Sequence, residues 1–172
     1  MFKSALVLAV LCIASHAEAQ PRAWDWTASV SYGQSFARTD HDGETGRPFL
    51  RTELTRRFLG PLAGGLYMVG VGEDGVLSHP SFGGGTVLRF NLRLGRFPLV
   101  PFAEGSIGRL RLRTNDGIDK LWDAQLGGGL GLRFRRAGFE VIARHQWFLD
   151  RDTNEPASRN VSVSGALVFH MD

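Results

Sequence analysis

Apolar and polar residues alternate along most of this chain, and this alternation constrains its fold more than any other feature. In the segment LGGGLGLRF the apolar residues fall on even positions: Leu126, Leu130, Leu132 and Phe134. A period of two residues is that of a β-strand with one apolar face and one polar or empty face. The glycines at 127–129 therefore belong to a strand. Neither they nor the glycines at 83–85 fit the G-x-x-x-x-G-K-[ST] pattern of a phosphate-binding loop, and no helical pattern follows them.

The alternation recurs in eight segments, and we predict that each is a strand. They span approximately residues 24–38, 48–59, 62–72, 82–94, 99–113, 123–134, 139–149 and 160–171. The connections after the second, fourth and sixth segments are short, whereas those after the others are longer and polar. An even number of antiparallel strands, with short turns at one end and long loops at the other, is typical of bacterial outer-membrane barrels. Tilted strands need ~9–11 residues to cross a membrane, and these segments are long enough.

The N-terminus has the three parts of a secretory signal peptide. Lys3 gives the positive start, residues 5–14 give the apolar run, and residues 17–19 read AEA, a cleavage site of the A-x-A type. We therefore predict a signal peptide over residues 1–19 and a single barrel domain over residues 20–172. No run of eighteen apolar residues follows, so no transmembrane helix is predicted.

The basic residues of this chain are almost all arginines. Of the 20 Lys and Arg residues, only Lys3 and Lys120 are lysines. Arginine without lysine indicates fixed, paired cations rather than a solvated surface. The net charge is +3, but the arginines occur singly or in adjacent pairs and form no basic block, so no nucleic-acid partner is predicted. The single cysteine, Cys12, lies within the signal peptide, so the domain is expected to contain no disulfide.

Two barrels of opposite polarity fit the alternation: a membrane barrel with its apolar face outside, and a soluble lipocalin-like barrel with its apolar face inside. The polar face carries charges of both signs among small residues: Arg51, Glu53, Arg57, Arg89, Arg93, Asp123, Arg133, Glu140 and Arg144. The apolar face carries aromatic residues near the strand ends: Trp24, Trp26, Phe36, Phe58, Phe97, Trp122, Phe134, Phe139, Trp147 and Phe169. Ion pairs suit the narrow interior of an eight-stranded barrel, and aromatic girdles lie at membrane interfaces. We therefore favour the membrane barrel, with a packed lumen and no wide pore.

Two segments alternate less regularly. In the third segment, one face carries Tyr67, Val69 and Val71, and the other carries Met68, Gly70 and Gly72. In the fifth, Val100, Phe102, Leu110 and Leu112 form the apolar set, opposite Arg109, Arg111 and Arg113, which are expected in the lumen. Glu104 has the phase of this apolar set and would face lipid, at a cost of a few kcal/mol. We predict a β-bulge near Gly105 or Gly108 that turns Glu104 inward, toward Arg109 or Arg89.

The whole mature chain resembles the small eight-stranded outer-membrane barrels of the OmpA/OmpX type. The best local matches are VPFAEGSIG (100–108), LGGGLGLRF (126–134) and VSVSGALVF (161–169). The resemblance implies an all-β, antiparallel, up-and-down transmembrane barrel with short periplasmic turns and longer extracellular loops. It implies a structural or surface-interaction role in the bacterial outer membrane, without catalytic activity. Its expected partners are outer-membrane lipid, lipopolysaccharide and the outer-membrane assembly machinery, and the expected state is a monomer.

The C-terminus departs from this family pattern. Barrels of this family usually end on an aromatic residue that the assembly machinery reads, whereas Phe169 is followed by His170, Met171 and Asp172.

An alternative function is suggested by PFAEGSIG followed by a late ARHQWF, which resembles the PagL family of lipid A deacylases. This resemblance implies an acyl ester hydrolase acting at the lipid-facing surface, with His145 as a catalytic residue. The family pattern requires a serine two residues after the histidine and a glutamate about fourteen after it, but Trp147 and Arg159 stand there. A histidine activates only a hydroxyl within hydrogen-bond reach. We therefore favour an interfacial packing role for His145 and predict no catalytic residue.

Other polar groups give no cofactor or metal prediction. The segment with Asp40, His41, Asp42 and Glu44 has oxygen ligands at alternate positions, as a Ca²⁺ site would, but ordinary exposed loops share this composition. We therefore expect a solvated loop there. His79 and His170 have no partners at the spacing of metal ligands.

Overall fold

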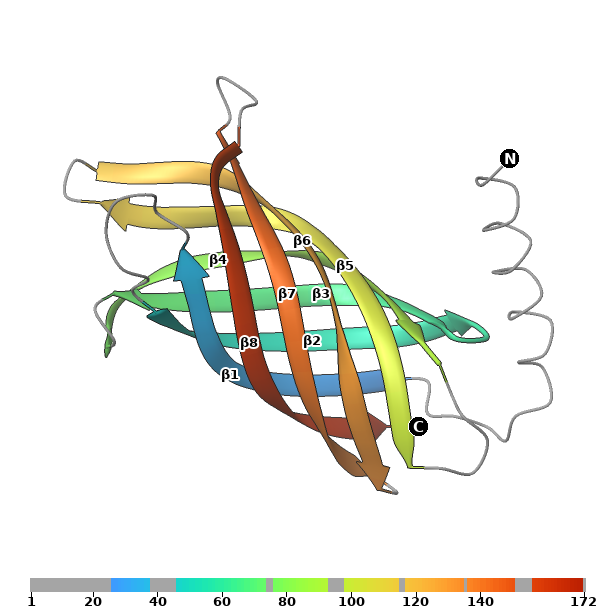
Figure 1. Ribbon diagram of the computed structural model, residues 1–172. Helices are drawn as coiled ribbons and strands as arrows, with labels where there is room; N and C mark the ends of the chain where they lie inside the picture. The colour runs from blue at the N-terminus through green and yellow to red at the C-terminus, as the bar shows by residue number, and fades with distance from the viewer. Residues whose placement is uncertain are drawn as a thin grey trace.

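The computed structural model describes residues 26–37, 46–73, 76–92, 98–114, 117–134, 136–150 and 156–171. Its strands are β1 (Trp26–Ala37), β2 (Gly46–Leu59), β3 (Leu62–Glu73), β4 (Val76–Asn91), β5 (Leu99–Thr114), β6 (Gly117–Phe134), β7 (Ala137–Asp150) and β8 (Pro156–Met171). They form a closed barrel in sequence order, in which β8 pairs with β1 and every pair is antiparallel (Figure 1). The predicted all-β, eight-stranded antiparallel barrel is therefore confirmed. The predicted signal peptide lies outside the described residues.

Two hairpins are longer than the sequence pattern predicted. β3 and β4 remain paired as far as Glu73 and Val76, and β5 and β6 as far as Thr114 and Gly117. Much of the sequence expected to form long polar loops is therefore strand. Apolar and polar residues alternate only in the part of a strand where one face contacts an apolar environment. Backbone hydrogen bonding continues beyond that part, through polar residues.

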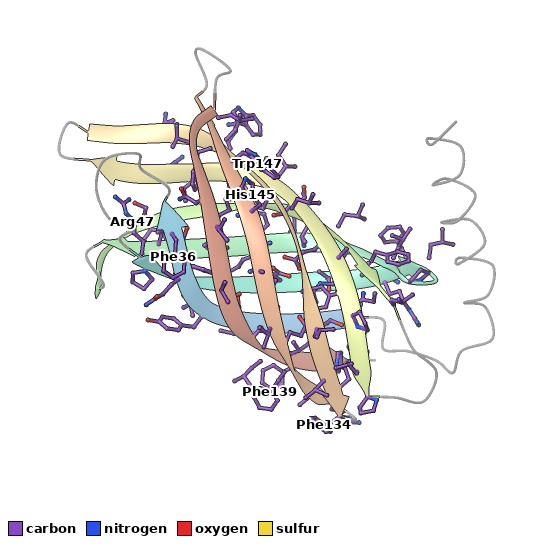
Figure 2. All side chains as sticks on the ribbon, viewed as in Figure 1. Phe36, Arg47, Phe134, Phe139, His145 and Trp147 are labelled. Carbon is purple, nitrogen blue, oxygen red and sulfur yellow. The ribbon has the colours of Figure 1, made fainter. Side chains whose placement is uncertain are left out.

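The outer wall of the barrel is apolar. Large hydrophobic side chains point outward from all eight strands, among them Val30, Leu54, Met68, Leu88, Ile107, Leu126, Val141 and Leu167. In β1, β2, β4, β6, β7 and β8 the predicted apolar set faces outward, as expected. Figure 2 places Phe134 and Phe139 near one end of the barrel and Trp147 toward the other. A soluble barrel would bury these side chains, so the polarity of this barrel is that of one surrounded by lipid.

The fifth predicted strand has the opposite phase to the one expected, and the irregular third strand also turns an apolar set inward. Tyr67 and Val69 of β3 are buried inside the barrel, whereas Met68 points outward and is 69% exposed. In β5 the apolar set is likewise inside: Val100, Phe102 and Leu110 are buried. Arg109 and Arg111 are exposed on the outer wall, so their predicted position in the lumen is wrong.

Glu104 faces the lumen, as predicted, but without a bulge. The β5–β6 register is unbroken from Leu99 opposite Leu132 to Thr114 opposite Gly117, and the β4–β5 register is continuous too. Strict alternation turns Glu104 inward together with Phe102 and Leu110. The predicted bulge near Gly105 or Gly108 is therefore wrong. Glu104 lies on the same face of β5 as Phe102 and Leu110, and this entire face points into the lumen.

The β2–β3 connection is a two-residue turn. At the end where Trp26 pairs with Met171, β2 and β3 are joined by Gly60 and Pro61, and Gly60 has a φ of 47°. Glycine adopts this left-handed conformation without steric cost, which permits so short a turn.

Among the described residues no helix is long and apolar enough to span a membrane.

Candidate functional site

The strands place a network of buried charges across the lumen. Arg89 of β4 lies at its centre, with its side chain 3% exposed. Its Nε and Nη2 donate to Glu104 of β5 at 3.2 and 2.9 Å, and its Nη1 donates to both carboxylate oxygens of Glu140 of β7, at 3.1 and 2.9 Å. The Arg89 guanidinium also lies over the ring of Phe102, with 4.1 Å between Cζ and the ring centroid. One arginine thus connects three strands.

Two further arginines extend the network around the barrel. Arg144 of β7 donates from Nε to Glu104 at 2.6 Å, from Nη2 to Glu53 of β2 at 3.2 Å and from Nη1 to Ser164 of β8 at 3.1 Å. Arg51 of β2 donates from Nε to Glu53 at 2.6 Å. Each carboxylate of Glu53 and Glu104 is therefore shared between two or more guanidinium groups, so displacing one side chain disturbs several pairs.

Two uncharged side chains, Gln125 and Tyr67, connect Arg51 to Asp123. Arg51 donates from Nη1 to Gln125 Oε1 at 2.7 Å, and its Cζ lies 3.9 Å from the centroid of the Tyr67 ring. Gln125 Nε2 and the Tyr67 hydroxyl both donate to Asp123 Oδ2, at 2.6 and 3.1 Å. A buried carboxylate is costly unless it is hydrogen-bonded, and these two donors supply that compensation.

The network comes close to charge balance. The deeply buried charges are three arginines and four carboxylates: Arg51, Arg89, Arg144, Glu53, Glu104, Asp123 and Glu140. Arg133 adds a fourth cation 3.9 Å from Glu140, with its side chain 12% exposed. Multiply shared, hydrogen-bonded pairs of this kind hold their geometry firmly. The middle of the lumen is therefore filled by side chains rather than by an open channel.

Glycines on β6 make room for these large side chains. A Cβ at Gly127 would lie 2.5 Å from the carbonyl oxygen of Ala143 and 2.8 Å from Cγ of Arg144. A Cβ at Gly129 would clash with the carbonyl oxygen of Val141 and lie 2.8 Å from Cζ of Phe102. Contacts this short require one partner to move. Glycine at these two positions therefore allows both the close approach of the β7 backbone and the passage of the Arg144 and Phe102 side chains across the lumen.

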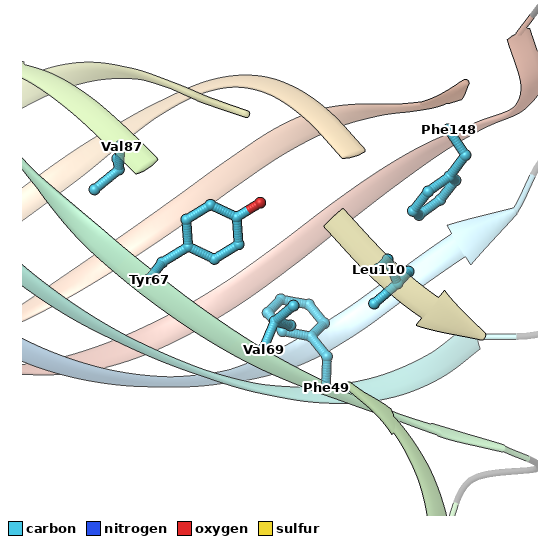
Figure 3. Packing of buried hydrophobic residues seen from close by; sticks show 6 residues of the cluster. All are labelled: Phe49, Tyr67, Val69, Val87, Leu110 and Phe148. Carbon is cyan, nitrogen blue, oxygen red and sulfur yellow. The ribbon is translucent and has the colours of Figure 1, made fainter. Parts of the chain in front are cut away.

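An apolar cluster lies inside the barrel beside the charges. It comprises Phe49, Tyr67, Val69, Val87, Leu110 and Phe148 (Figure 3). Four of these residues line a cavity of about 230 Å³ in the half of the barrel away from the Trp26–Met171 end. The opposite wall of this cavity is polar, where Ser35 donates to Gln146 at 3.2 Å. The lumen therefore has an apolar region that the predicted polar interior did not include.

His145 lies on the outer wall of β7, half-buried beside Trp147. The two ring centroids are 4.4 Å apart and the planes are inclined at 60°, an edge-to-face arrangement. Among the described side chains, His145 makes no hydrogen bond to a hydroxyl or a carboxylate. These contacts are those of interfacial packing; the catalytic role stays an untested alternative.

Of the other polar candidates, only the side chain of His170 is described. Asp40, His41, Asp42 and Glu44 lie outside the described residues, as does the side chain of His79. His170 is buried at the Trp26–Met171 end, with Nδ1 3.4 Å from the Thr27 hydroxyl. Within the described strands and turns, no group of three or more His, Cys, Asp or Glu side chains could hold a metal ion.

Tyr67 and the inward phase of β5 are the parts of the site that the sequence interpretation missed. The signal was available in Glu104, because a carboxylate that must face the lumen carries Phe102 and Leu110 inward with it under strict alternation. The same alternation carries Arg109 and Arg111 outward.

The fold is shared with solved barrel structures. The crystal structure of Neisserial surface protein A (NspA) matches with a TM-score of 0.67 and 11% identity, over 88% of this chain and 100% of that chain. The N-terminal β-barrel domain of Pseudomonas aeruginosa OprF matches with a TM-score of 0.60 and 10% identity, over 86% and 100%. No protein-family model and no curated protein matches the sequence. The comparison confirms the resemblance to small eight-stranded barrels of the OmpA type.

Proposed function

We propose that this chain is a monomeric outer-membrane barrel with a structural or surface-interaction role and no catalytic activity. The observation that carries the proposal is its inverted polarity, with an apolar outer wall around a charged, ion-paired lumen. Apolar side chains exposed on every strand stabilise the barrel only where lipid surrounds it. A closed barrel also has no free strand edge, which a hydrocarbon environment requires.

The proposed orientation places the Trp26–Met171 end in the periplasm. The short Gly60-Pro61 turn is at this end, and outer-membrane barrels have their short turns on the periplasmic side. Export through a signal peptide over residues 1–19 belongs to the same proposal. The assembly machinery would then meet a final strand whose outward residues are Phe169 and Met171, since His170 points into the lumen.

The proposed role excludes a wide pore. Arg89 and Arg144, with Glu53, Glu104 and Glu140, cross the middle of the lumen, and breaking any of these pairs would leave a buried charge. Surface interaction would therefore involve the outer wall and the connections at the end away from Trp26 rather than transport through the barrel.

Cell fractionation combined with heat-modifiable electrophoresis tests this proposal. We expect the chain in the outer-membrane fraction, with a folded band that shifts on boiling, and no conductance steps of porin size in planar bilayers. The variant Leu126→Arg tests the same proposal. It places a charge on the outer wall where lipid is expected and should cost about 2–4 kcal/mol of folding stability. Release of the protein with the periplasm, together with full tolerance of Leu126→Arg, would instead indicate a soluble barrel.

A further inference from the structure

The outer wall carries a cationic patch that the ion network does not use. Arg109 and Arg111 of β5 and Lys120 of β6 are all exposed on this wall. Arg111 is directly opposite Lys120 in the β5–β6 register, and Arg109 is directly opposite Trp122. The Cζ of Arg109 lies 4.6 Å from the centroid of a Trp122 ring, so the tryptophan fixes one cation of the patch.

Among the described side chains, no carboxylate pairs with this patch. No salt bridge joins Arg109, Arg111 or Lys120 to any described carboxylate, whereas Arg51, Arg89 and Arg144 each pair with at least one. Directly opposite residues on antiparallel strands have Cβ atoms about 5 Å apart, and like charges in such positions destabilise the pair. An anion bound between Arg111 and Lys120 would offset this repulsion.

The depth of the patch matches a membrane interface. The outward residues of β5 from Leu99 to Ile107 carry no charge, and Arg109 and Arg111 follow them. At about 3.4 Å per residue and a tilt of about 40°, that uncharged stretch spans about 21 Å, close to the ~25 Å apolar band of such barrels. Trp122 then stands at the level of an aromatic girdle. The three cations lie just beyond the hydrocarbon, where lipid headgroups begin.

We propose that Arg109, Arg111, Lys120 and Trp122 form a binding site for the phosphate groups of the glycolipid in the outer leaflet, that is, of lipid A. The inference rests on the proposed outer-membrane location and orientation, which place this end of the barrel outside. Guanidinium and ammonium groups bind phosphate oxygens through charge-assisted hydrogen bonds. The exposed Phe82, opposite Arg111 on β4, gives the patch an apolar border for the adjoining acyl chain.

The chain contains a matched control for this site. Arg56 of β2 also lies over a tryptophan on the outer wall, with its Cζ 5.4 Å from a Trp26 ring centroid. It is at the opposite end of the barrel, where Trp26 pairs with Met171. Arg56→Gln therefore removes the same kind of arginine–tryptophan contact from the periplasmic interface and leaves the proposed site intact.

Native mass spectrometry of the folded barrel tests the site with three probes: bisphosphorylated lipid A, its monophosphorylated form and its fully dephosphorylated form. We expect affinity to fall in that order for the unaltered protein. The double variant Arg111→Gln/Lys120→Gln should bind bisphosphorylated lipid A about 30-fold more weakly, because each basic side chain near an anionic lipid contributes a factor of about five. Arg56→Gln should bind as the unaltered protein does.

Equal binding of the three lipids by the unaltered protein would overturn this inference without any variant being needed. An equal loss in Arg56→Gln would overturn it too, since the effect would then belong to any wall arginine. Insertion into phosphatidylcholine vesicles separates this inference from the proposed function. A barrel that inserts but does not discriminate phosphates refutes the site alone, whereas a chain that fails to insert refutes the membrane location and the site together.

Discussion

Replacing Arg89 by methionine tests the claim that one arginine joins the lumen charges into a unit. The substitution keeps an unbranched but shorter side chain and removes the Arg89 donors to Glu104 and Glu140. Glu104 retains Arg144 at 2.6 Å, but the nearest cation left to Glu140 is Arg133 at 3.9 Å. Breaking a buried pair by removing one partner costs about 3–5 kcal/mol, so we expect that loss in the free energy of unfolding.

The partners that Glu104 and Glu140 keep in the Arg89→Met variant predict which carboxylate causes the loss of stability. Most of it should come from Glu140, because Glu104 is still paired. In the Arg89→Met background, Glu140→Gln should therefore recover stability, whereas alone it should destabilise the barrel. The coupling free energy between the two positions should be about 2–3 kcal/mol, near the top of the range for residues in one network. Glu104→Gln should couple to Arg89→Met less strongly.

Urea-induced unfolding in lipid vesicles, followed by tryptophan fluorescence and by the gel shift on boiling, measures these free energies. Arg136→Met, at an exposed position in the β6–β7 turn, is the control and should change stability by less than about 0.5 kcal/mol. Additive effects of Arg89→Met and Glu140→Gln would refute the network interpretation. A cost of Arg89→Met no larger than that of the control would do the same, because it would mean that water already solvates these charges.

Three further predictions concern single residues. Tyr67→Phe removes one of the two buried donors to Asp123 and should lower the free energy of unfolding by about 1–3 kcal/mol in the same urea assay; an unchanged midpoint would mean that water replaces the hydroxyl. Gly129→Ala should cost about 1–3 kcal/mol, because its Cβ would meet the carbonyl oxygen of Val141 and the ring of Phe102; Phe102→Leu in the same chain should relieve only the part due to the ring, which the boiling temperature of the gel shift would report. Lipid A from cells expressing the protein and from cells expressing His145→Ala should have identical mass spectra, whereas loss of one acyl chain with the intact protein only would establish the deacylase.

Strand number and most strand faces could be predicted from the sequence because they depend on local spacing. Outward sets such as Leu126, Leu130 and Leu132 repeat every two residues, and any strand with that spacing has one apolar face. The glycine run of β6 was likewise assignable to a strand. What the run accommodates was not predictable, since the contacts of Gly127 with Arg144 and of Gly129 with Phe102 come from neighbouring strands.

The candidate site was only partly predictable for the same reason. The list of charges on the polar face includes Arg51, Arg89, Arg144 and Glu140, which do meet in the lumen. Their pairing depends on which strands lie across the barrel from one another. The sequence separations of these contacts, such as 91 residues between Glu53 and Arg144, carry no periodic signal.

The period of two in this sequence determined by itself that the chain is an eight-stranded barrel with two unlike walls. It did not determine which set of each strand faces inward where both sets contain apolar residues, as in β3 and β5. Only the closed barrel decided that, because the register with its neighbours sets the phase of a whole strand at once. Glu104 entered the lumen with Phe102 and Leu110, and the same rotation left Arg109 and Arg111 on the outer wall.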